Sequence, residues 1–348
     1  MTAPDVSPVD LRSDTVTTPT PGMRRAMVDA AVGDACYGED PTVNRLEAVI
    51  AERLGKEKAL FVVSGTMGNQ LGLATHLRAG DAAMCEATAH IALWEGAGVA
   101  ALSGAQLVEV AAEDGLPSVA ALNAAQPPAV TKAPRLRVLS LENTHNSSGG
   151  RAHHPDALAT QQHWAREQGL ALHLDGARVF NACVATGVSV EAMTKGFDTI
   201  SVCFSKGLGA PVGSALVGPA GNLAEADRIR HRIGGGWRQA GILAAAALYA
   251  LEHHVDRLSD DHARATRLGE AMRSIGVARP SHPIDTNLIC FEVDPAWGNA
   301  KRFESAMAVQ GVLLYATGPQ TGRLVTHLGV DDGAVDRVVK AMQTLESV

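Results

Sequence analysis

The stretch TISVCFSKGLGAPVG, residues 199–213, decides the fold. Its first part is a run of strand-forming residues, with Ile200, Val202 and Phe204 at every second position, which favours a strand. The strand ends at Lys206, and glycines follow. A lysine at a strand end commonly extends into water, but Lys206 differs from the other lysines because those lie in polar helices, loops or surface turns. The other six are Lys56, Lys58, Lys132, Lys195, Lys301 and Lys340.

Strand and helix signals alternate on both sides of this stretch. Such alternation predicts an α/β fold, with a mainly parallel sheet that helices cover on both faces. The pattern changes after about residue 255, where a polar helix over 256–275 leads into a smaller α+β unit. We therefore expect a large domain over 1–255 and a small C-terminal domain over 256–348. The strands expected in the large domain include ALFVVSG (59–65), RLRVLSLEN (135–143), LALHLDG (170–176), DTISVCFS (198–205) and SALVGP (214–219).

Composition narrows the class of function. The chain of 348 residues has a formal net charge of −7 and no long basic run, which argues against nucleic acid or an acidic membrane as a partner. The N-terminal residues show no leader pattern, and the run GILAAAALYALEHHV is too short for a membrane span. The five cysteines form no C-x-x-C pair and no metal-ligand spacing occurs, so we expect a cytoplasmic protein with reduced thiols and no metal site.

Polar residues mark the ends of three of the predicted strands. SGTMGN (64–69) places Gly65 and Thr66 between a strand and a helix, where free N–H groups suit a phosphate, although a capped turn without a ligand has the same sequence. Asp175 ends an apolar strand, and a carboxylate there also serves as a helix cap. Lys206 ends the third strand. An amine that loses hydration near the protein interior becomes a nucleophile for aldehydes.

The three strand ends together predict a site for pyridoxal 5'-phosphate (PLP). This cofactor needs a lysine for a Schiff base, an acid beside its pyridine nitrogen, and a phosphate-binding turn. Lys206 follows Asp175 by about 31 residues, which is one strand–helix–strand step, so the two strand ends are expected to be neighbours. Gly207 and Gly209 would let the backbone pass close to the cofactor.

Eight segments then carry a family resemblance across nearly the whole chain. They are DLRSDTVTTPT, GDACYGEDPTVNRLE, SGTMGNQLG, LENTHN, LHLDGARVFNA, SKGLGAPVGS, GGGWRQAGILAAA and RLVTHL. In this order they resemble the low-specificity L-threonine aldolases, PLP enzymes of the aspartate-aminotransferase fold (fold type I). The resemblance implies reversible retro-aldol cleavage of L-threonine, L-allo-threonine and related β-hydroxy-α-amino acids to glycine and an aldehyde. It also implies a homotetramer built as a dimer of dimers, with sites between paired subunits.

The resemblance assigns roles to individual residues. For the cofactor, it implies that Lys206 forms the Schiff base, Asp175 pairs with the pyridine nitrogen and Arg178 lies near the cofactor hydroxyl and the substrate carboxylate. Gly65 and Thr66 would hold the phosphate, with help from Arg238 of a neighbouring subunit.

The resemblance also implies contacts with the substrate. Ser13 and Arg323 would bind the substrate carboxylate, and Tyr37 would belong to an inter-subunit wall of the substrate site. His90 would stack on the cofactor ring near the substrate hydroxyl, and His145 would face that hydroxyl.

Several positions depart from the family pattern. Trp94 stands where members often have Phe or Tyr, SSGGR follows ENTHN, and His231 replaces a frequent lysine. These departures concern the β-substituent, so a phenylserine-type aldolase stays an alternative, as do β-elimination and transamination. A protein that only binds a ligand would not need Lys206, and no glycine fingerprint supports a dinucleotide dehydrogenase. The base for the hydroxyl proton is His90, His145 or an activated water.

Overall fold

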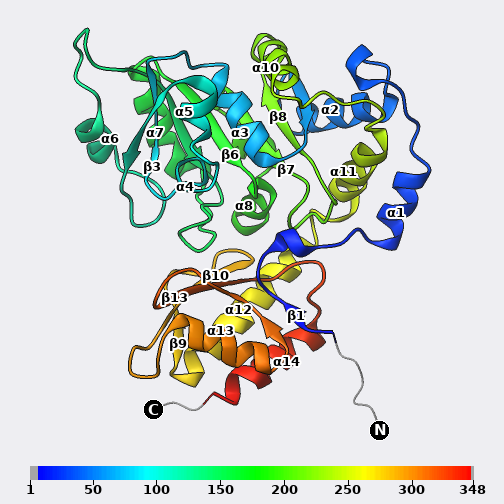
Figure 1. Ribbon diagram of the computed structural model, residues 1–348, viewed down its shortest axis with the longest axis vertical. Helices are drawn as coiled ribbons and strands as arrows, with labels where there is room; N and C mark the ends of the chain where they lie inside the picture. The colour runs from blue at the N-terminus through cyan, green and yellow to red at the C-terminus, as the bar shows by residue number, and fades with distance from the viewer. Residues whose placement is uncertain (1–6, 346–348) are drawn as a thin grey trace.

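The computed structural model describes residues 7–345 and has two lobes joined along one side (Figure 1). The larger lobe is built on a seven-stranded sheet with the strand order β2-β8-β7-β6-β5-β3-β4. The strands are β2 (Lys58–Val62), β3 (Asp81–Glu86), β4 (Gln106–Val110), β5 (Arg135–Glu142), β6 (Ala171–Gly176), β7 (Thr199–Cys203) and β8 (Ser214–Gly218). Each of the five strands expected in this domain is present.

The sheet is mainly parallel, as predicted, and β8 is the strand that runs against both of its neighbours. The connection from β7 to β8 covers residues 204–213, which is shorter than a parallel crossover requires, so the chain turns back on itself. β6 pairs in parallel with β7, which places Asp175 opposite Ser201. The carboxyl ends of β5, β6 and β7 therefore lie at one edge of the sheet.

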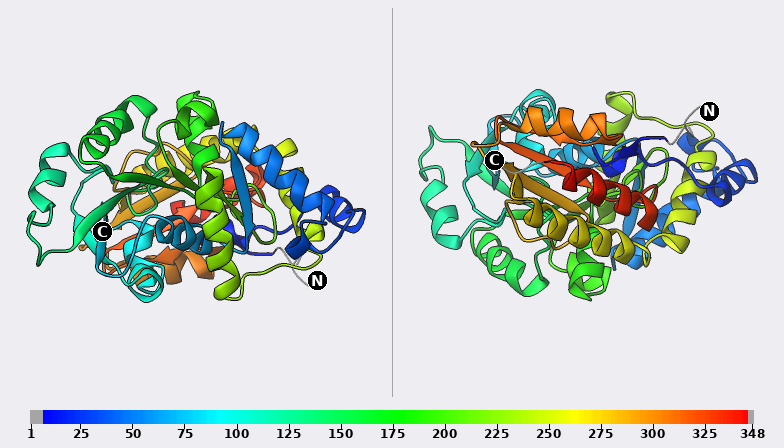
Figure 2. Two further views of the ribbon diagram at one scale, coloured as in Figure 1. Left: turned by 90° about the horizontal axis from the view of Figure 1, so that it is seen from above. Right: turned by 90° about the horizontal axis from the view of Figure 1, so that it is seen from below.

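Helices cover both faces of this sheet, as two further views show (Figure 2). Helices begin at local sequence signals. Asp40 is the N-cap of α2, and Pro41 is the first residue of that helix. Ser64 caps α3, because its side chain accepts a hydrogen bond from the N–H of Met67. The helices of this lobe are α1 (Pro21–Val28), α2 (Pro41–Arg53), α3 (Gly65–Ala74), α4 (His90–Leu93), α5 (Gly98–Ser103), α6 (Val119–Ala125), α7 (Pro155–Glu167), α8 (Val179–Thr186), α9 (Val190–Thr194), α10 (Ala220–Arg232) and α11 (Gly241–His253).

The smaller lobe packs α12 (Leu258–Ile275), α13 (Ala300–Val309) and α14 (Asp332–Gln343) against an antiparallel sheet. Its strand order is β12-β13-β10-β9. The strands are β9 (Ala278–Pro280), β10 (Leu288–Val293), β12 (Tyr315–Ala316) and β13 (Thr321–Val325). This arrangement matches the α+β pattern predicted after residue 255.

The N-terminal segment belongs to both lobes. β1 (Val9–Asp10) pairs in parallel with β11 (Val312–Leu313), and Val9 and Leu11 are buried in the hydrophobic core of the smaller lobe. The chain then crosses into the larger lobe through a short 3-10 helix, η1 (Asp14–Val16). The domain division at residue 255 stays a prediction, and the crossing puts residues 13–15 at the junction.

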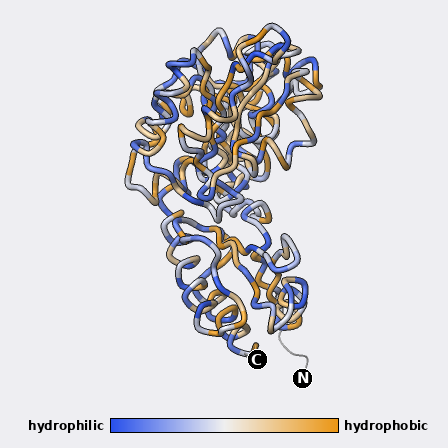
Figure 3. The backbone as a smooth tube through the Cα atoms, turned by 90° about the vertical axis from the view of Figure 1, so that its left-hand side faces the viewer, coloured by the Kyte–Doolittle hydropathy of each residue, from blue (hydrophilic) through white to orange (hydrophobic). Residues whose placement is uncertain are grey.

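Burial on both faces explains why the central strands are mostly apolar. Every residue of β3, β7 and β8 is buried, and apolar segments follow the inner strands of both lobes in Figure 3. Among residues 7–345, no helix is long and apolar enough to cross a membrane.

Candidate active site

A cavity of about 310 Å³ opens between the two lobes at the carboxyl edge of the large sheet. Three parts of the chain line it: the N-terminal crossing, the loops of the larger lobe, and the strands β12 and β13. The lining residues are Ser13, Thr15, His90, Trp94, Asn146, Arg178, Lys206, Tyr315, Thr317 and Arg323. The structure therefore brings six of the predicted site residues together around one cavity, and it adds four that the sequence did not single out.

Lys206 and Asp175 lie at the ends of neighbouring strands, which confirms the predicted adjacency. Asp175 is buried, and its Oδ2 accepts a hydrogen bond of 2.7 Å from Nδ2 of Asn69. The backbone oxygen of Lys206 accepts from the hydroxyl of Thr17 at 3.1 Å, which fixes the turn that presents the amine. Both charges act on the same imidazole, because Asp175 raises the pKa of His90 and Lys206 lowers it.

The start of α3 has the shape of a phosphate-binding turn. The first-turn N–H groups of Gly65 and Thr66 have no acceptor among residues 7–345. A Cβ on Gly65 would come within 2.6 Å of Sγ of Cys203, so glycine is required for this close approach. An anion at this helix start would meet free donors and the positive end of the helix dipole.

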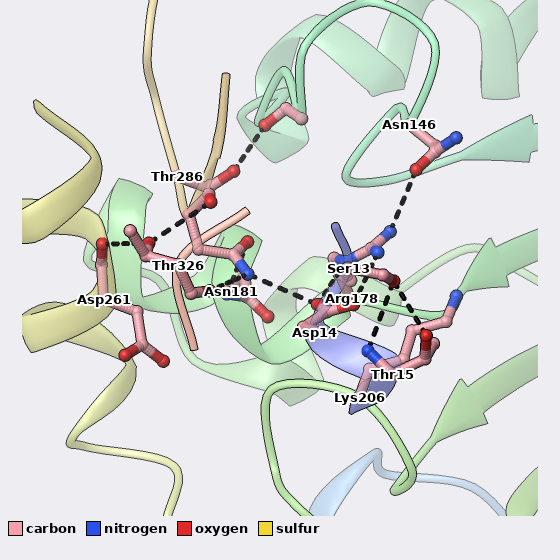
Figure 4. A network of polar contacts seen from close by, with 12 residues as sticks. Ser13, Asp14, Thr15, Asn146, Arg178, Asn181, Lys206, Asp261, Thr286 and Thr326 are labelled. Atoms are coloured by element: carbon pink, nitrogen blue, oxygen red, sulfur yellow. Dashed lines mark hydrogen bonds and ion pairs between the residues drawn. The ribbon is translucent and has the colours of Figure 1, made fainter. Parts of the chain in front are cut away.

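Two guanidinium groups, those of Arg178 and Arg323, line the cavity. Figure 4 shows Arg178 in contact with Asp14 on one side and Asn146 on the other. Nε and Nη2 of Arg178 donate to Asp14 at 2.7 and 2.8 Å, and both residues are buried. Burial opposes the charge of Asp14, but the charge and hydrogen bonds of Arg178 outweigh it and hold the pKa of Asp14 well below its ordinary value. The other guanidinium, Arg323, has no carboxylate partner among the described residues.

Asn146 lies between the two guanidinium groups. Its Oδ1 accepts from Nη1 of Arg178 at 3.3 Å and from Nη1 of Arg323 at 3.5 Å. Burial and the charge of Arg178 lower the pKa of Arg323, and its Nε is buried without a partner. The positive charge at this end of the cavity exceeds the negative charge, so the site fits an anionic ligand group such as a carboxylate.

His90 begins α4 on the cavity wall and is held from behind. Its Nδ1 lies 2.7 Å from Oε1 of Glu95, and its backbone N–H donates to Oε2 of Glu142 at 2.7 Å. Burial alone would lower the pKa of His90, but the hydrogen bond to Glu95 and the charge of Asp175 raise it. Nε2 has no hydrogen-bond partner among residues 7–345, which leaves it available to a ligand.

Two aromatic side chains flank the open end of the cavity. Trp94 ends α4 and is 64% exposed, while Tyr315 in β12 is 54% exposed. Ser13 also lines the cavity, and its Oγ accepts from the N–H and hydroxyl of Thr15 at 3.2 and 2.9 Å. These two aromatic rings offer apolar surface to the part of a ligand that extends away from the two guanidinium groups.

His145 does not reach this cavity. Its side chain is fully buried, with Nε2 at 3.0 Å from Oε2 of Glu86. Burial opposes protonation, but the adjacent carboxylate of Glu86 and the charge of Glu142 raise the pKa of His145. Gly115 packs so close that a Cβ there would lie 2.3 Å from Cγ of His145, so the ring is tightly enclosed.

Tyr37 and Arg238 also lie away from the cavity, but they lie close to each other. Tyr37 ends η2 (Ala35–Tyr37) and is 80% exposed. Arg238 contacts the neighbouring Cys36, with Nη1 at 2.7 Å from Sγ, and its backbone oxygen accepts from the N–H of Ala35 at 3.1 Å. Both residues therefore belong to one surface of the larger lobe.

Comparison with known proteins places the chain in a family. The model of the Beta-eliminating lyase family matches residues 10–295. The chain belongs to this family. It is 39% identical over 341 residues to "Low-specificity L-threonine aldolase 1" of Arabidopsis thaliana, an alignment that covers 96% of this chain and 95% of that protein.

Solved structures show that this family member has the PLP-enzyme fold of type I. A Leishmania major threonine aldolase has a TM-score of 0.84 and 19% identity, with 97% of this chain and 99% of that chain covered. A structure described as SPT with PLP has a TM-score of 0.75 and 17% identity, with 97% of this chain and 87% of that chain covered. The predicted fold class and family are thus confirmed.

Some site residues of this family member escaped the sequence analysis. Asp14 and Asn146 lie inside the quoted segments DLRSD and ENTHN, and Glu95 follows His90 by five positions. A carboxylate or amide within a recognised motif is a signal for a role at the site. What the sequence could not indicate is the partner, because Asn146 meets Arg323 across 177 residues of chain.

Proposed function

We propose that this protein cleaves L-threonine, L-allo-threonine and related β-hydroxy-α-amino acids reversibly to glycine and an aldehyde, as a PLP-dependent aldehyde-lyase. The observation that carries the proposal is the single cavity that Lys206 shares with two guanidinium groups and an imidazole. An amine, an anion-binding end and a proton acceptor are the three functions that this cleavage requires. The family and the named relatives support the same reaction class.

The residues at the strand ends fit PLP. Lys206 supplies the amine for the cofactor's aldehyde, Asp175 supplies the buried acid for its ring nitrogen, and the start of α3 at Gly65 and Thr66 supplies donors for its phosphate. When bound, the cofactor accepts the electrons that carbon–carbon cleavage releases. Asp175 would stabilise a protonated ring nitrogen, because its carboxylate is buried and held in place by a hydrogen bond from Asn69.

Arg323, Arg178 and Ser13 bind the carboxylate of the amino acid in this proposal. Asp14 fixes the Arg178 guanidinium, so the position of its Nη1 is set before the substrate binds. Arg323 has N–H groups that are not bound to any carboxylate of the described residues. A carboxylate held by two guanidinium groups cannot rotate freely. The substrate is thereby oriented about its N–Cα bond, which decides the bond that is broken.

His90 is the proton acceptor on the cavity wall, acting on the substrate hydroxyl directly or through one water. Glu95 accepts the hydrogen of Nδ1, so the lone pair of the neutral ring is on Nε2. His145 is enclosed behind the cavity and acts through Glu86 and Glu142 rather than on the substrate. Its charge compensates two buried carboxylates, one of which holds the backbone of His90.

A second candidate is a preference for aromatic β-substituents, as in phenylserine. Trp94 and Tyr315 at the open end of the cavity favour it, because aromatic rings gain from stacking as well as from burial. We further propose a cytoplasmic homotetramer in which Tyr37 and Arg238 reach a neighbouring subunit's site. Their shared exposed surface on the larger lobe supports this role.

The decisive test uses Lys206→Ala with Lys195→Ala as the matched control, since Lys195 is exposed and outside the cavity. The proteins are incubated with L-threonine, L-allo-threonine and L-phenylserine, and glycine and aldehyde are measured separately. We expect equal amounts of both products from the wild type and the control. Lys206→Ala should lose the absorbance of lysine-bound cofactor and nearly all turnover. Wild-type turnover in Lys206→Ala, or a keto acid as the main product, would refute the proposal.

A further inference from the structure

Asn69 connects two carboxylates that serve different parts of the site. It lies on α3 and is 1% exposed. Its Nδ2 is 2.7 Å from Oδ2 of Asp175 and 2.8 Å from Oε1 of Glu95. An amide nitrogen carries two hydrogens, so each carboxylate receives one of them. Water cannot replace either donor at a position that is closed to solvent.

The orientation of the Asn69 amide is fixed by its other end. Oδ1 lies 3.1 Å from Nε2 of His173, and Nδ1 of that ring lies 2.9 Å from the hydroxyl of Thr199. Burial lowers the pKa of His173 to about 4, so the ring is neutral and carries one hydrogen. That hydrogen is on Nε2, because Oδ1 is an acceptor only, and the amide nitrogen must face the carboxylates.

Glu95 carries the connection on to His90. Its Oε1 accepts from Nδ1 of His90 at 2.7 Å, and its Oε2 accepts from Nε2 of Gln70 at 2.6 Å. The ligand atoms of His90, Glu95 and Asp175 all lie within 4.8 Å of one another, a spacing that would also suit a metal ion. Amide and imidazole donors already bind these oxygens, which explains the close approach of the three groups without a metal.

We propose that Asn69 is a positioning residue that joins Asp175 and His90 into one hydrogen-bonded unit, with Glu95 as the link to the imidazole. This inference rests on the proposed function for the roles of Asp175 and His90. One amide then sets both the acid that holds the cofactor's ring nitrogen and the imidazole that accepts the substrate's proton. The same helix also begins at the phosphate-binding turn, so α3 organises three parts of the site.

Removal of the shared amide has two separable consequences. Asp175 and Glu95 would face each other without a common donor, so like-charge repulsion would favour protonation of one of them. Asp175 would then hold the ring nitrogen less well. The charged groups that face His90 are Glu95, Asp175 and Lys206, with Glu142 at its backbone. The less stabilised carboxylates would make the Glu95–His90 pair bind its proton at higher pH.

The test compares Asn69→Leu with Gln70→Leu, a matched control that removes a donor to Glu95 but leaves Asp175 untouched. Two quantities are measured: the Kd for pyridoxal 5'-phosphate, and the NMR titration of His90 in cofactor-free protein, assigned with His90→Gln. Loss of a charge-assisted hydrogen bond should raise Kd about tenfold to a hundredfold in Asn69→Leu and leave it within about twofold in Gln70→Leu. The His90 titration should move to higher pH in Asn69→Leu.

A third variant separates the effect of Asn69 on Asp175 from its effect on Glu95 and His90. Glu95→Gln should lower the pKa of His90. In that background Asn69→Leu should still raise Kd, but it should move the His90 titration less than it does in the wild-type background, because only the more remote Asp175 is left to act on the ring. Asn69→Asp keeps the side-chain shape and should give the same directions as Asn69→Leu, which covers a failure of the leucine variant to fold. The proposal is wrong if both Asn69 variants keep the wild-type Kd and His90 titration, or match Gln70→Leu. The NMR readout does not depend on turnover, so it stands even if the proposed reaction fails its own test.

Discussion

The buried ion pair between Asp14 and Arg178 allows a sharp prediction for Asp14→Asn. Asp14 lies on the crossing between the lobes, Arg178 belongs to the larger lobe, and Nδ2 of Asn287 in the smaller lobe also donates to Asp14 at 3.3 Å. The substitution keeps the shape of the side chain and removes its charge. It leaves the guanidinium of Arg178 buried beside Arg323 without a carboxylate in contact.

The expected cost follows from burial and geometry. Asp14 is fully buried, Arg178 is 5% exposed, and two hydrogen bonds of 2.7 and 2.8 Å join them. Breaking a pair of this kind from one side costs about 3–5 kcal/mol, because the remaining charge is not compensated. Asparagine can still accept one hydrogen bond from Arg178, so we expect a loss near the lower end, about 3 kcal/mol. The Arg178 guanidinium should also be less well fixed, which raises KM.

The assay is urea unfolding of cofactor-free protein at one protein concentration. The matched control is Asp285→Asn, because Asp285 and Arg151 form a partly exposed ion pair between the lobes at 2.9 Å and should contribute about 1 kcal/mol or less. Asp14→Asn combined with Arg178→Gln should cost clearly less than the two single variants together, since the double variant buries no uncompensated charge. Equal losses for Asp14→Asn and Asp285→Asn, or strict additivity in the double variant, would refute the reasoning.

Three further outcomes follow from the structure. Burial lowers the pKa of His173 from 6.5 to about 4, so between these two pH values the unfolded chain binds a proton that the native state excludes. The free energy of unfolding should therefore fall by about 3 kcal/mol as the pH drops from 6.5 towards 4. Urea unfolding of His173→Asn should show a smaller fall over the same pH range. Gly65→Ala should raise the Kd for pyridoxal 5'-phosphate about tenfold in a cofactor titration, because its Cβ overpacks against Cys203, and Cys203→Ala should restore much of the affinity. Trp94→Ala should raise KM about twofold to tenfold more for L-phenylserine than for L-threonine, and equal changes would exclude stacking at that position.

The sequence predicted the framework of the site well, because that framework follows from chain-local signals. Strand ends are marked by the change from apolar residues to Asp175 or to Lys206, and one strand–helix–strand step makes such ends neighbours. The reversal of β8 and the pairing of β1 with β11 were not predicted. The first depends on the length of one connection, and the second brings together two-residue strands that are too short to show any periodicity.

The side chains behind the site were less predictable, for a physical reason. A hydrogen bond between buried polar groups depends on the three-dimensional approach of two elements and leaves no periodic pattern in either one. Asn69 and Asp175 are 106 residues apart, and Asp14 and Arg178 are 164 residues apart. His145 is a second example. Its motif can be recognised in the sequence, but its contacts with Gly115 and Glu86, which enclose the ring, cannot be predicted from that motif.

The buried carboxylates explain how so much charge is accommodated beside one small cavity. Glu95 is compensated by amide and imidazole donors, Glu142 by the backbone N–H groups of His90 and Asn146, and Asp14 by Arg178. Each of these carboxylates holds a residue that lines the cavity, so the cost of burying it is offset by the fixed position of a functional group. Arg323 differs from these compensated groups, because its Nε is buried and has no hydrogen-bond partner. A substrate carboxylate therefore gains the most binding free energy at this position.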